Sequence, residues 1–170
     1  MKIIKSFLII FFFTLINGLC SAENNEEFDG KGGREDLSFL NAKNSNFKKG
    51  KDALKQVQKL INKNKTKKAN KRLEDAIEYF ILANDQLPNN VNILSYLGLS
   101  YYLADDPIMS EIYYMDGLSL DPENYLINAK LAELYLNTKK IELAKERLNV
   151  LKSCNCQEYS KLKDIIEKNY

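Results

Sequence analysis

The sequence contains no histidine and no tryptophan, and its three prolines and seven glycines are few for 170 residues. The absence of histidine removes the most frequent general base and the most frequent metal ligand. The remaining residues contain no glycine-rich phosphate loop and no nucleophile paired with an activating base. We therefore predict that the chain is not an enzyme and that it holds neither a cofactor nor a metal ion.

Long apolar runs are also missing, with one exception at the N-terminus. Residues 7–16 (FLIIFFFTLI) are apolar except for Thr14, follow Lys2 and Lys5, and lead to a small-residue cleavage site at Ala22. This order is typical of a secretory signal peptide, and the run is shorter than the roughly 20 apolar residues of a membrane span. We predict that residues 1–22 are a signal peptide and that the chain is exported to the periplasm. An uncleaved segment would be the chain's only attachment to a membrane.

Sustained alternation of apolar and polar residues, which would indicate strands, is absent as well. Residues 23–46 carry three glycines and few apolar side chains, which predicts a flexible leader. Later segments repeat apolar residues every three or four positions, which predicts an all-α domain over residues 47–170. Asp106 and Asp121 each precede a proline and are the expected caps of two helices. The predicted helices cover residues 47–62, 66–86, 91–103, 107–118, 122–137, 141–152 and 156–168.

A period of 34 residues is present in the second half of the chain. Pro88 and Pro122 are 34 positions apart. In the unit that begins at Val91, the residues at positions 7, 8, 11 and 24 are Leu97, Gly98, Tyr101 and Tyr114. This pattern resembles that of the tetratricopeptide repeat family, in which L-G-x2-Y lies on the first of two paired helices. The resemblance implies a solenoid of helix pairs and attaches no chemistry to it.

The resemblance extends over three units. Residues 91–124 match well and depart only at position 20, where Ser110 replaces alanine. Residues 125–158 match moderately, and residues 57–90 match only in their second half. An insertion is expected to displace the first helix of this last unit, because its Leu, Gly and Tyr positions hold Lys63, Asn64 and Lys67. We expect about three helix pairs, closed by a capping helix over residues 156–168.

Nine residues are expected to build the packing of this solenoid. Small residues would let paired helices approach closely, and large ones would fill the space between successive pairs. These residues are Ala76, Phe80, Leu97, Gly98, Tyr101, Tyr114, Ala132, Tyr135 and Ala144.

In the family that the chain resembles, the first helix of each pair lines a concave groove that binds an extended peptide or a partner helix. Transferred by position, the groove residues would be Asn92, Ser95, Leu99, Tyr102, Leu126, Ala129, Glu133, Leu136 and Asn137. This set has one acid and no base, so it lacks the basic residues with which some relatives bind a terminal carboxylate. The resemblance therefore implies an interaction scaffold for a protein partner. Binding through the convex surface or a basic surface is the alternative.

Charge is strongly segregated along the chain. Residues 43–72 hold twelve bases and one acid, whereas residues 73–135 hold eleven acids and one base. Such blocks affect association more than fold. Three interpretations of the basic segment 63–72 are open: a solvated helix face, a surface for anionic envelope polymers or lipid headgroups, and a complement to the acidic block of a second copy in a homo-oligomer. We predict no nucleic-acid partner, because no aromatic residue interleaves with these bases and the chain is expected to be exported.

Cysteine is scarce, and Cys20 belongs to the predicted signal peptide. Leu19 precedes it where lipidated cysteines usually follow a small residue, so we expect no lipid anchor. The remaining pair, Cys154 and Cys156, would occupy an oxidising compartment. A disulfide across one residue would be strained and readily reduced, and two thiolates alone would fill half of a zinc site. A local disulfide, buried thiols, a link to a partner or second copy, and a redox or copper role are the open interpretations.

Overall fold

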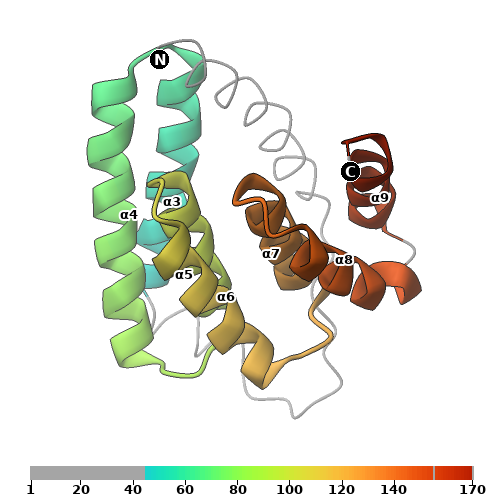
Figure 1. Cartoon of the computed structure of the whole chain (residues 1–170). Helices are drawn as coiled ribbons and strands as arrows, with labels where there is room; N and C mark the ends of the chain where they lie inside the picture. The colour runs from blue at the N-terminus through green and yellow to red at the C-terminus, as the bar shows by residue number, and fades with distance from the viewer. Residues whose placement is uncertain (1–44, 155, 170) are drawn as a thin grey trace. The chain divides into compact units, whose positions relative to one another are not determined.

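The computed structural model describes residues 45–154 and 156–169, which form seven α-helices and one 3-10 helix (Figure 1). The helices are α3 (Ser45–Asn62), α4 (Thr66–Gln86), α5 (Val91–Leu103), α6 (Pro107–Leu120), α7 (Tyr125–Asn137), α8 (Ile141–Val150), η1 (Leu151–Ser153) and α9 (Gln157–Asn169). The predicted signal peptide, 1–22, and residues 23–44 of the predicted leader lie outside the described residues. Within the described residues, no helix is both long enough and apolar enough to cross a membrane.

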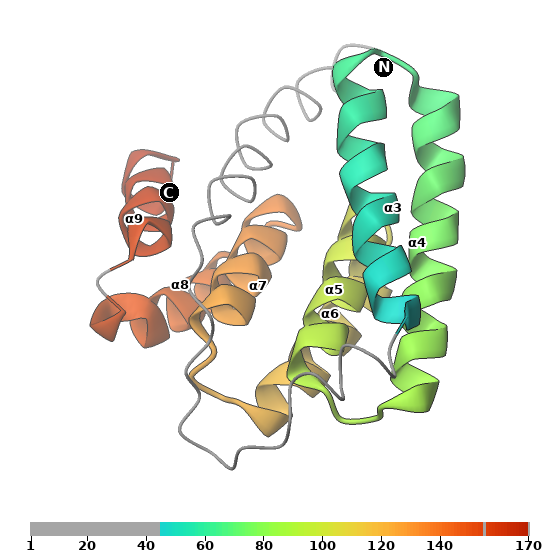
Figure 2. The same cartoon turned by 180° about the vertical axis from the view of Figure 1, so that it is seen from behind.

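The helices pack as three successive antiparallel pairs, α3 with α4, α5 with α6 and α7 with α8 (Figures 1 and 2). The second helix of one pair also packs on the first helix of the next, α4 on α5 and α6 on α7, and α9 packs on α7 and α8. This is an all-α solenoid of three helix pairs with a closing helix, so the predicted fold class is confirmed.

Side-chain caps explain where three of the helices begin. Asn90, Asp106 and Asn124 each accept a hydrogen bond from a backbone N–H in the first turn of α5, α6 and α7. Such caps satisfy donors that have no partner inside the helix. The prediction that Asp121 caps the third of these helices is wrong. Helix α6 continues to Leu120, which makes Asp121 its C-terminal flank and leaves the next start to Asn124.

The remaining boundaries differ from the predicted ones by a few residues. Helix α3 begins at Ser45 rather than at 47, and α9 covers Gln157–Asn169 rather than 156–168. Helix α8 ends at Val150, after which residues 151–153 form the 3-10 turn η1. A tightened last turn of this kind is common at the end of an α-helix.

The insertion expected in the first unit is visible in the packing of two glycines. A Cβ atom added to Gly98 would lie 2.5 Å from the ring of Tyr114, and one added to Gly50 would lie 2.6 Å from the ring of Phe80. Phe80 and Tyr114 are 34 positions apart, so Gly50 plays the part of Gly98 in the first pair. The unbroken 34-residue period would have placed that part at Asn64, which is 14 residues later.

These 14 residues lengthen the first hairpin by about seven residues in each helix. Helix α4 begins at Thr66, whereas the residue 34 positions before Pro107, the first residue of α6, is Leu73. Seven residues are close to two turns of α-helix at 3.6 residues per turn. The extension therefore keeps the same helix faces inward, and Val57, Ala69 and Leu73 form its buried interior.

The residues expected to build the packing lie where helices meet. Eight of the nine are buried, and Tyr101 is half-buried, with its ring stacked on that of Tyr113 at 5.4 Å. Ser110, the departure from the pattern, is completely buried, and its hydroxyl donates to the carbonyl oxygen of Gly98 at 2.9 Å. This bond satisfies the buried hydroxyl and joins α6 to α5.

Candidate functional site

The first helices of the three pairs lie next to one another and form one surface, which we call the A face (α3, α5 and α7). Phe47 of α3 contacts Tyr96 of α5, with ring centroids 5.3 Å apart. Tyr102 of α5 and Asn137 of α7 are hydrogen-bonded, the amide of Asn137 donating to the phenolic oxygen. Helix α9 extends the row, because its Leu162 and Ile166 belong to the same apolar cluster as the buried residues of α7.

The nine groove residues transferred from the family pattern differ widely in exposure. Asn92, Leu126 and Asn137 are exposed, and Ser95, Leu99, Tyr102 and Glu133 are partly covered. Ala129 has no exposed surface and Leu136 has 9%. A ligand on the A face would therefore meet the exposed and half-covered residues, whereas Ala129 and Leu136 support them from below.

A polar cluster lies at the junction of α5 and α7. Lys130 donates to Glu133 at 3.0 Å, and their side chains are only 12% and 11% exposed. Burial raises the pKa of Glu133, although the charge and hydrogen bond of Lys130 oppose the shift. Burial, and next the nearby charge of Glu133, also raise the pKa of Tyr102 well above its usual value. This cluster fixes α5 against α7, so Tyr102 and Glu133 are coupled to the stability of the A face.

The corrected position of the first pair adds residues to the A face that the sequence pattern missed. With Gly50 equivalent to Gly98, the residues that correspond to Leu99 and Leu103 are Lys51 and Lys55 of α3. The ammonium group of Lys51 lies 5.0 Å from the centre of the Phe47 ring. The face thus includes bases at its α3 end. A glycine 30 residues before the phenylalanine, rather than 16 as in the regular repeat, was the available signal.

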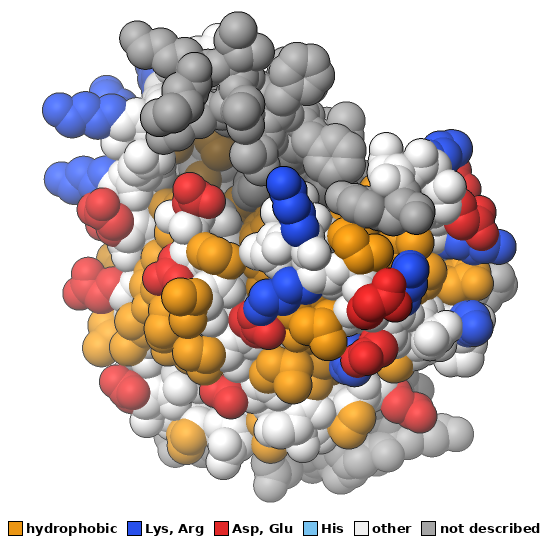
Figure 3. Space-filling view, in the orientation of Figure 1, with side chains coloured by type: hydrophobic (Ala, Val, Ile, Leu, Met, Phe, Trp, Pro, Cys, Tyr) orange, Lys and Arg blue, Asp and Glu red, His pale blue; other side chains and the backbone are white. Residues whose placement is uncertain are grey.

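The surface formed by the second helices differs from the A face, because it exposes large apolar side chains. Ile81 and Leu82 of α4 are 37% and 41% exposed, and Ile108, Ile112 and Met115 of α6 are 73%, 45% and 47% exposed. Figure 3 shows hydrophobic side chains gathered over α4 and α6, with acidic side chains around them. We call these five residues the α4–α6 patch.

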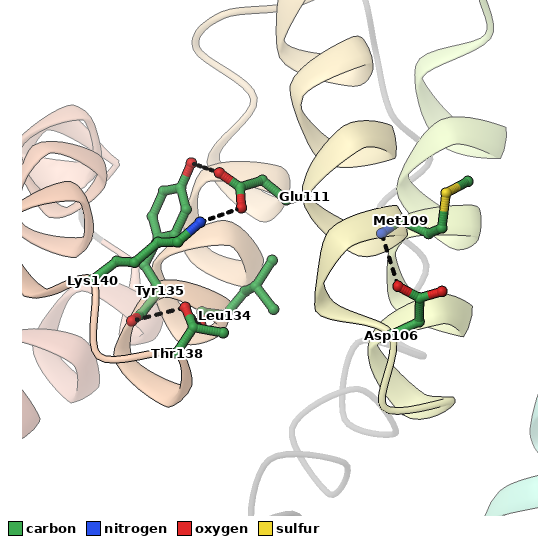
Figure 4. A network of polar contacts seen from close by, with 7 residues as sticks. All are labelled: Asp106, Met109, Glu111, Leu134, Tyr135, Thr138 and Lys140. Atoms are coloured by element: carbon green, nitrogen blue, oxygen red, sulfur yellow. Dashed lines mark hydrogen bonds and ion pairs between the residues drawn. The ribbon is translucent and has the colours of Figure 1, made fainter.

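A small network holds the third pair against α6 beside this patch (Figure 4). Lys140 pairs with Glu111 at 2.6 Å, and the hydroxyl of Tyr135 donates to the other oxygen of the same carboxylate at 3.1 Å. Burial and the bond to Glu111 raise the pKa of Tyr135 to about 12. The network fixes how α6 meets the turn between α7 and α8, and its charges are already paired.

The two cysteines of the predicted pair are joined in a disulfide between Cys154 and Cys156. Both are partly covered, and Cys154 packs on the apolar cluster of the third pair and α9. While this bond is intact, neither sulfur is available to a partner chain. A redox or metal role of the pair stays a prediction.

Comparison with known proteins identifies the fold and no close relative. No protein-family model and no curated protein matches the chain. Thirty-one chains among the solved structures match. One is the first tetratricopeptide domain of Spaghetti (RPAP3) bound to the HSP90 peptide SRMEEVD, with 16% sequence identity and a TM-score of 0.53. The match covers 71% of this chain and 92% of that chain. The chain therefore has the fold of a tetratricopeptide domain.

Proposed function

We propose that this chain is a non-enzymatic interaction module that binds a peptide or helix of a partner protein on its A face. The observation that carries the proposal is the tetratricopeptide fold, in which α3, α5 and α7 form one continuous face. The similar solved domain holds a short peptide, which supports the same mode of binding here. Fold alone does not fix function, so the residues of the face must supply the rest of the argument.

The A face has the mixed character of a surface that recognises a peptide. Asn92 and Asn137 offer exposed amides, and Leu126 is 39% exposed. Lys51 and Lys55 at the α3 end add positive charge. Amide side chains can bond the backbone of an extended peptide, and exposed lysines favour acidic residues by charge complementarity. We infer that the preferred segment carries acidic residues where it meets α3.

The test is capture of partners with a tagged form of the whole chain from an extract of its own host, followed by mapping with variants. Ser95→Arg places a large charge in the middle of the A face without emptying the core. Ser119→Arg is the matched control, since Ser119 is exposed on α6. A discrete protein that the wild type and Ser119→Arg retain, and that Ser95→Arg loses, supports the proposal. Equal retention by both variants contradicts it.

The periplasmic setting belongs to the same proposal and rests on the N-terminal sequence. Residues 1–22 have the basic, apolar and small-residue order of a secretory signal. Fractionation of the host and determination of the mature N-terminus test this. An N-terminus at Glu23 in the periplasmic fraction supports export, and the full-length chain in the cytosolic fraction contradicts it.

A further inference from the structure

The lengthened hairpin ends in a strongly basic surface, which we call the basic tip (residues 59–72). It contains seven bases and no acid, and all seven are exposed: Lys59, Lys63, Lys65, Lys67, Lys68, Lys71 and Arg72. Arg72 pairs with Asp75 at the lower edge of the tip. The tip extends past the C-terminal end of α5, because Leu103, the last residue of α5, packs on the Val57–Leu73 cluster below it.

The position of these charges is unfavourable for the fold. The first turn of α4 has no acidic residue, and Lys65 makes no side-chain cap. Cations at a helix N-terminus oppose the helix dipole, at a cost of about 0.3–1 kcal/mol each. Residues that break a local rule of helix design are expected at functional surfaces. The tip therefore carries charge that the folding of the hairpin does not need.

The α4–α6 patch has the opposite character. Between residues 73 and 129 the chain holds ten acids and no base. Asp85 of α4 and Asp116 of α6 are exposed and both lie close enough to Tyr113 to raise its pKa, after the effect of burial. Tyr113 in turn packs on the cluster that contains Phe80 and Ala83 of α4. The two helices thus form one surface, apolar at its centre and acidic around it.

The patch is large enough in side-chain content to attract a partner. Ile108, Ile112 and Met115 recur at spacings of four and three residues, so they form one stripe along α6. With Glu111 and Asp116 they line an open depression of about 390 Å³. A contiguous exposed apolar patch with a polar rim is the usual mark of an interaction site.

The tip and the patch of one molecule cannot meet. Both include residues of the uninterrupted helix α4, and Lys67 and Leu82 are 15 residues apart, about 22 Å along a straight helix. Figure 3 shows basic side chains near the upper end of α4 and the apolar group lower down. Complementary surfaces held apart on one rigid body can pair only between molecules, and such pairing is head to tail.

We propose that copies of this chain associate head to tail, with the basic tip of one copy docked on the acid-rimmed α4–α6 patch of the next. The lysines of the tip face Asp85, Asp116 and the other acids of the rim. Leu60 and Ile61, which are only partly covered within their own hairpin, meet the apolar centre. Because the contact does not close on itself, it forms open chains whose length depends on concentration. The second copy occupies a surface distinct from the A face.

Sedimentation velocity of the full chain, in its processed form, tests this association over a wide range of concentrations. The tip variant is Lys67→Glu/Lys68→Glu and the patch variant is Ile112→Glu. Lys152→Glu/Lys168→Glu is the control for the tip, since it makes the same charge change at two exposed lysines elsewhere. Leu143→Glu on α8, where the side chain is 36% exposed, is the control for the patch.

The wild type and both controls should form concentration-dependent oligomers, and each variant alone should stay monomeric. Raising the ionic strength from about 0.1 M to about 1 M shortens the Debye length from about 10 Å to about 3 Å, and should weaken association about tenfold or more. A mixture of the two variants should stop at a dimer, because it joins the intact tip of one variant to the intact patch of the other.

Three results overturn the proposal. The first is a wild type that remains monomeric at every concentration. The second is oligomerisation that neither variant changes, which would place the contact elsewhere. The third is a monomeric wild type whose tip binds vesicles of anionic phospholipid and loses that binding in Lys67→Glu/Lys68→Glu, which would assign the tip to a membrane surface. None of these results affects binding on the A face, which Ser95→Arg reports separately.

Discussion

The first hairpin and the two regular pairs that follow it share one packing rule and differ in what they add to it. At the base of α3 and α4, Gly50 lies against the ring of Phe80, as Gly98 lies against the ring of Tyr114 in the next pair. Above that base, α3 and α4 continue for about two turns each, and the added surface is basic. The regular pairs have no such extension, and their helices begin at side-chain caps.

This difference shows which positions a helix hairpin needs and which are open to change. The close approach at Gly50 and Gly98 fixes the pairing of the helices, because neither ring can move in a closely packed interior. A hairpin can grow at its far end if each helix gains whole turns, since the inward faces then stay aligned. The following predictions test this comparison.

The largest effect should come from the two rings at the bases. Phe80 and Tyr114 are completely buried, so Phe80→Ala and Tyr114→Ala should each lower the free energy of unfolding by about 3–5 kcal/mol. Chemical denaturation monitored by circular dichroism measures both. Tyr125→Ala is the control, because its 53% exposed ring should cost at most about 0.5 kcal/mol. A much smaller loss for Phe80 than for Tyr114 would mean that the two bases are not equivalent.

The glycines should show the same equivalence on a smaller scale. An added methyl group would lie 2.6 Å from Phe80 at Gly50 and 2.5 Å from Tyr114 at Gly98. Overpacking should destabilise Gly50→Ala and Gly98→Ala by about 1–3 kcal/mol, reduced by up to about 1 kcal/mol of improved helix propensity. Gly117→Ala is the comparison, because its methyl group would meet Cδ1 of Ile127, the end of a flexible side chain. A gain in thermal stability at Gly50 alone would argue against the shared packing rule.

The helix starts should separate the two regions. Asp106 accepts a bond from the backbone N–H of Met109 at 3.1 Å, so Asp106→Ala should cost about 1 kcal/mol. Lys65 makes no cap at the start of α4, and Lys65→Ala should be neutral or stabilise by about 0.3–1 kcal/mol, because it removes a cation from the helix N-terminus. Thermal unfolding of both variants at low salt measures the contrast. Equal losses at the two positions would show that Lys65 supports its helix.

The smallest expected effect is a change in pH dependence that belongs to the regular pairs. Burial raises the pKa of Glu133 above its ordinary value of 4.5, so the folded state binds this proton more tightly than the unfolded state. The contribution of Glu133 to stability is therefore present below pH 4.5 and is lost as pH rises through the folded-state value. Glu133→Gln removes this dependence, and its stability relative to wild type should increase across that window.

Denaturation at several pH values checks this prediction. The control is Glu142→Gln, whose side chain is 82% exposed. A stability difference between Glu133→Gln and wild type that stays constant with pH would mean that the Lys130 pair fully offsets the burial of Glu133.

Several elements could be predicted from the sequence because they depend on neighbours along the chain. Apolar spacing and stop signals gave α4 and α5 their observed ends, and Asp106 gave the start of α6. The start at Asp121 was wrong, because an aspartate before a proline can equally follow a helix that has not yet ended. Asn124, with its bond to the N–H of Ile127 at 3.1 Å, was the residue that mattered.

The candidate site was less predictable, because exposure depends on helices that are distant in the sequence. Ala129 and Leu136 occupy positions that line the groove in the resembling family, yet they are buried here. Lys51 reaches the A face only because α3 is displaced by the insertion. The α4–α6 patch combines residues about 30 positions apart, and no local pattern indicates that they form one surface.

By itself the sequence determined the helical class, the 34-residue period, the hairpin pairing and the separation of charge, since each follows from the order and spacing of neighbouring residues. Only the tertiary structure decided that Gly50 is the partner of Phe80, that the bases lie on an extended tip, and that the exposed apolar residues of α4 and α6 gather on one acid-rimmed surface. The physical reason is that close packing relates positions on different helices, and a shift by whole turns leaves every local pattern unchanged while moving each contact.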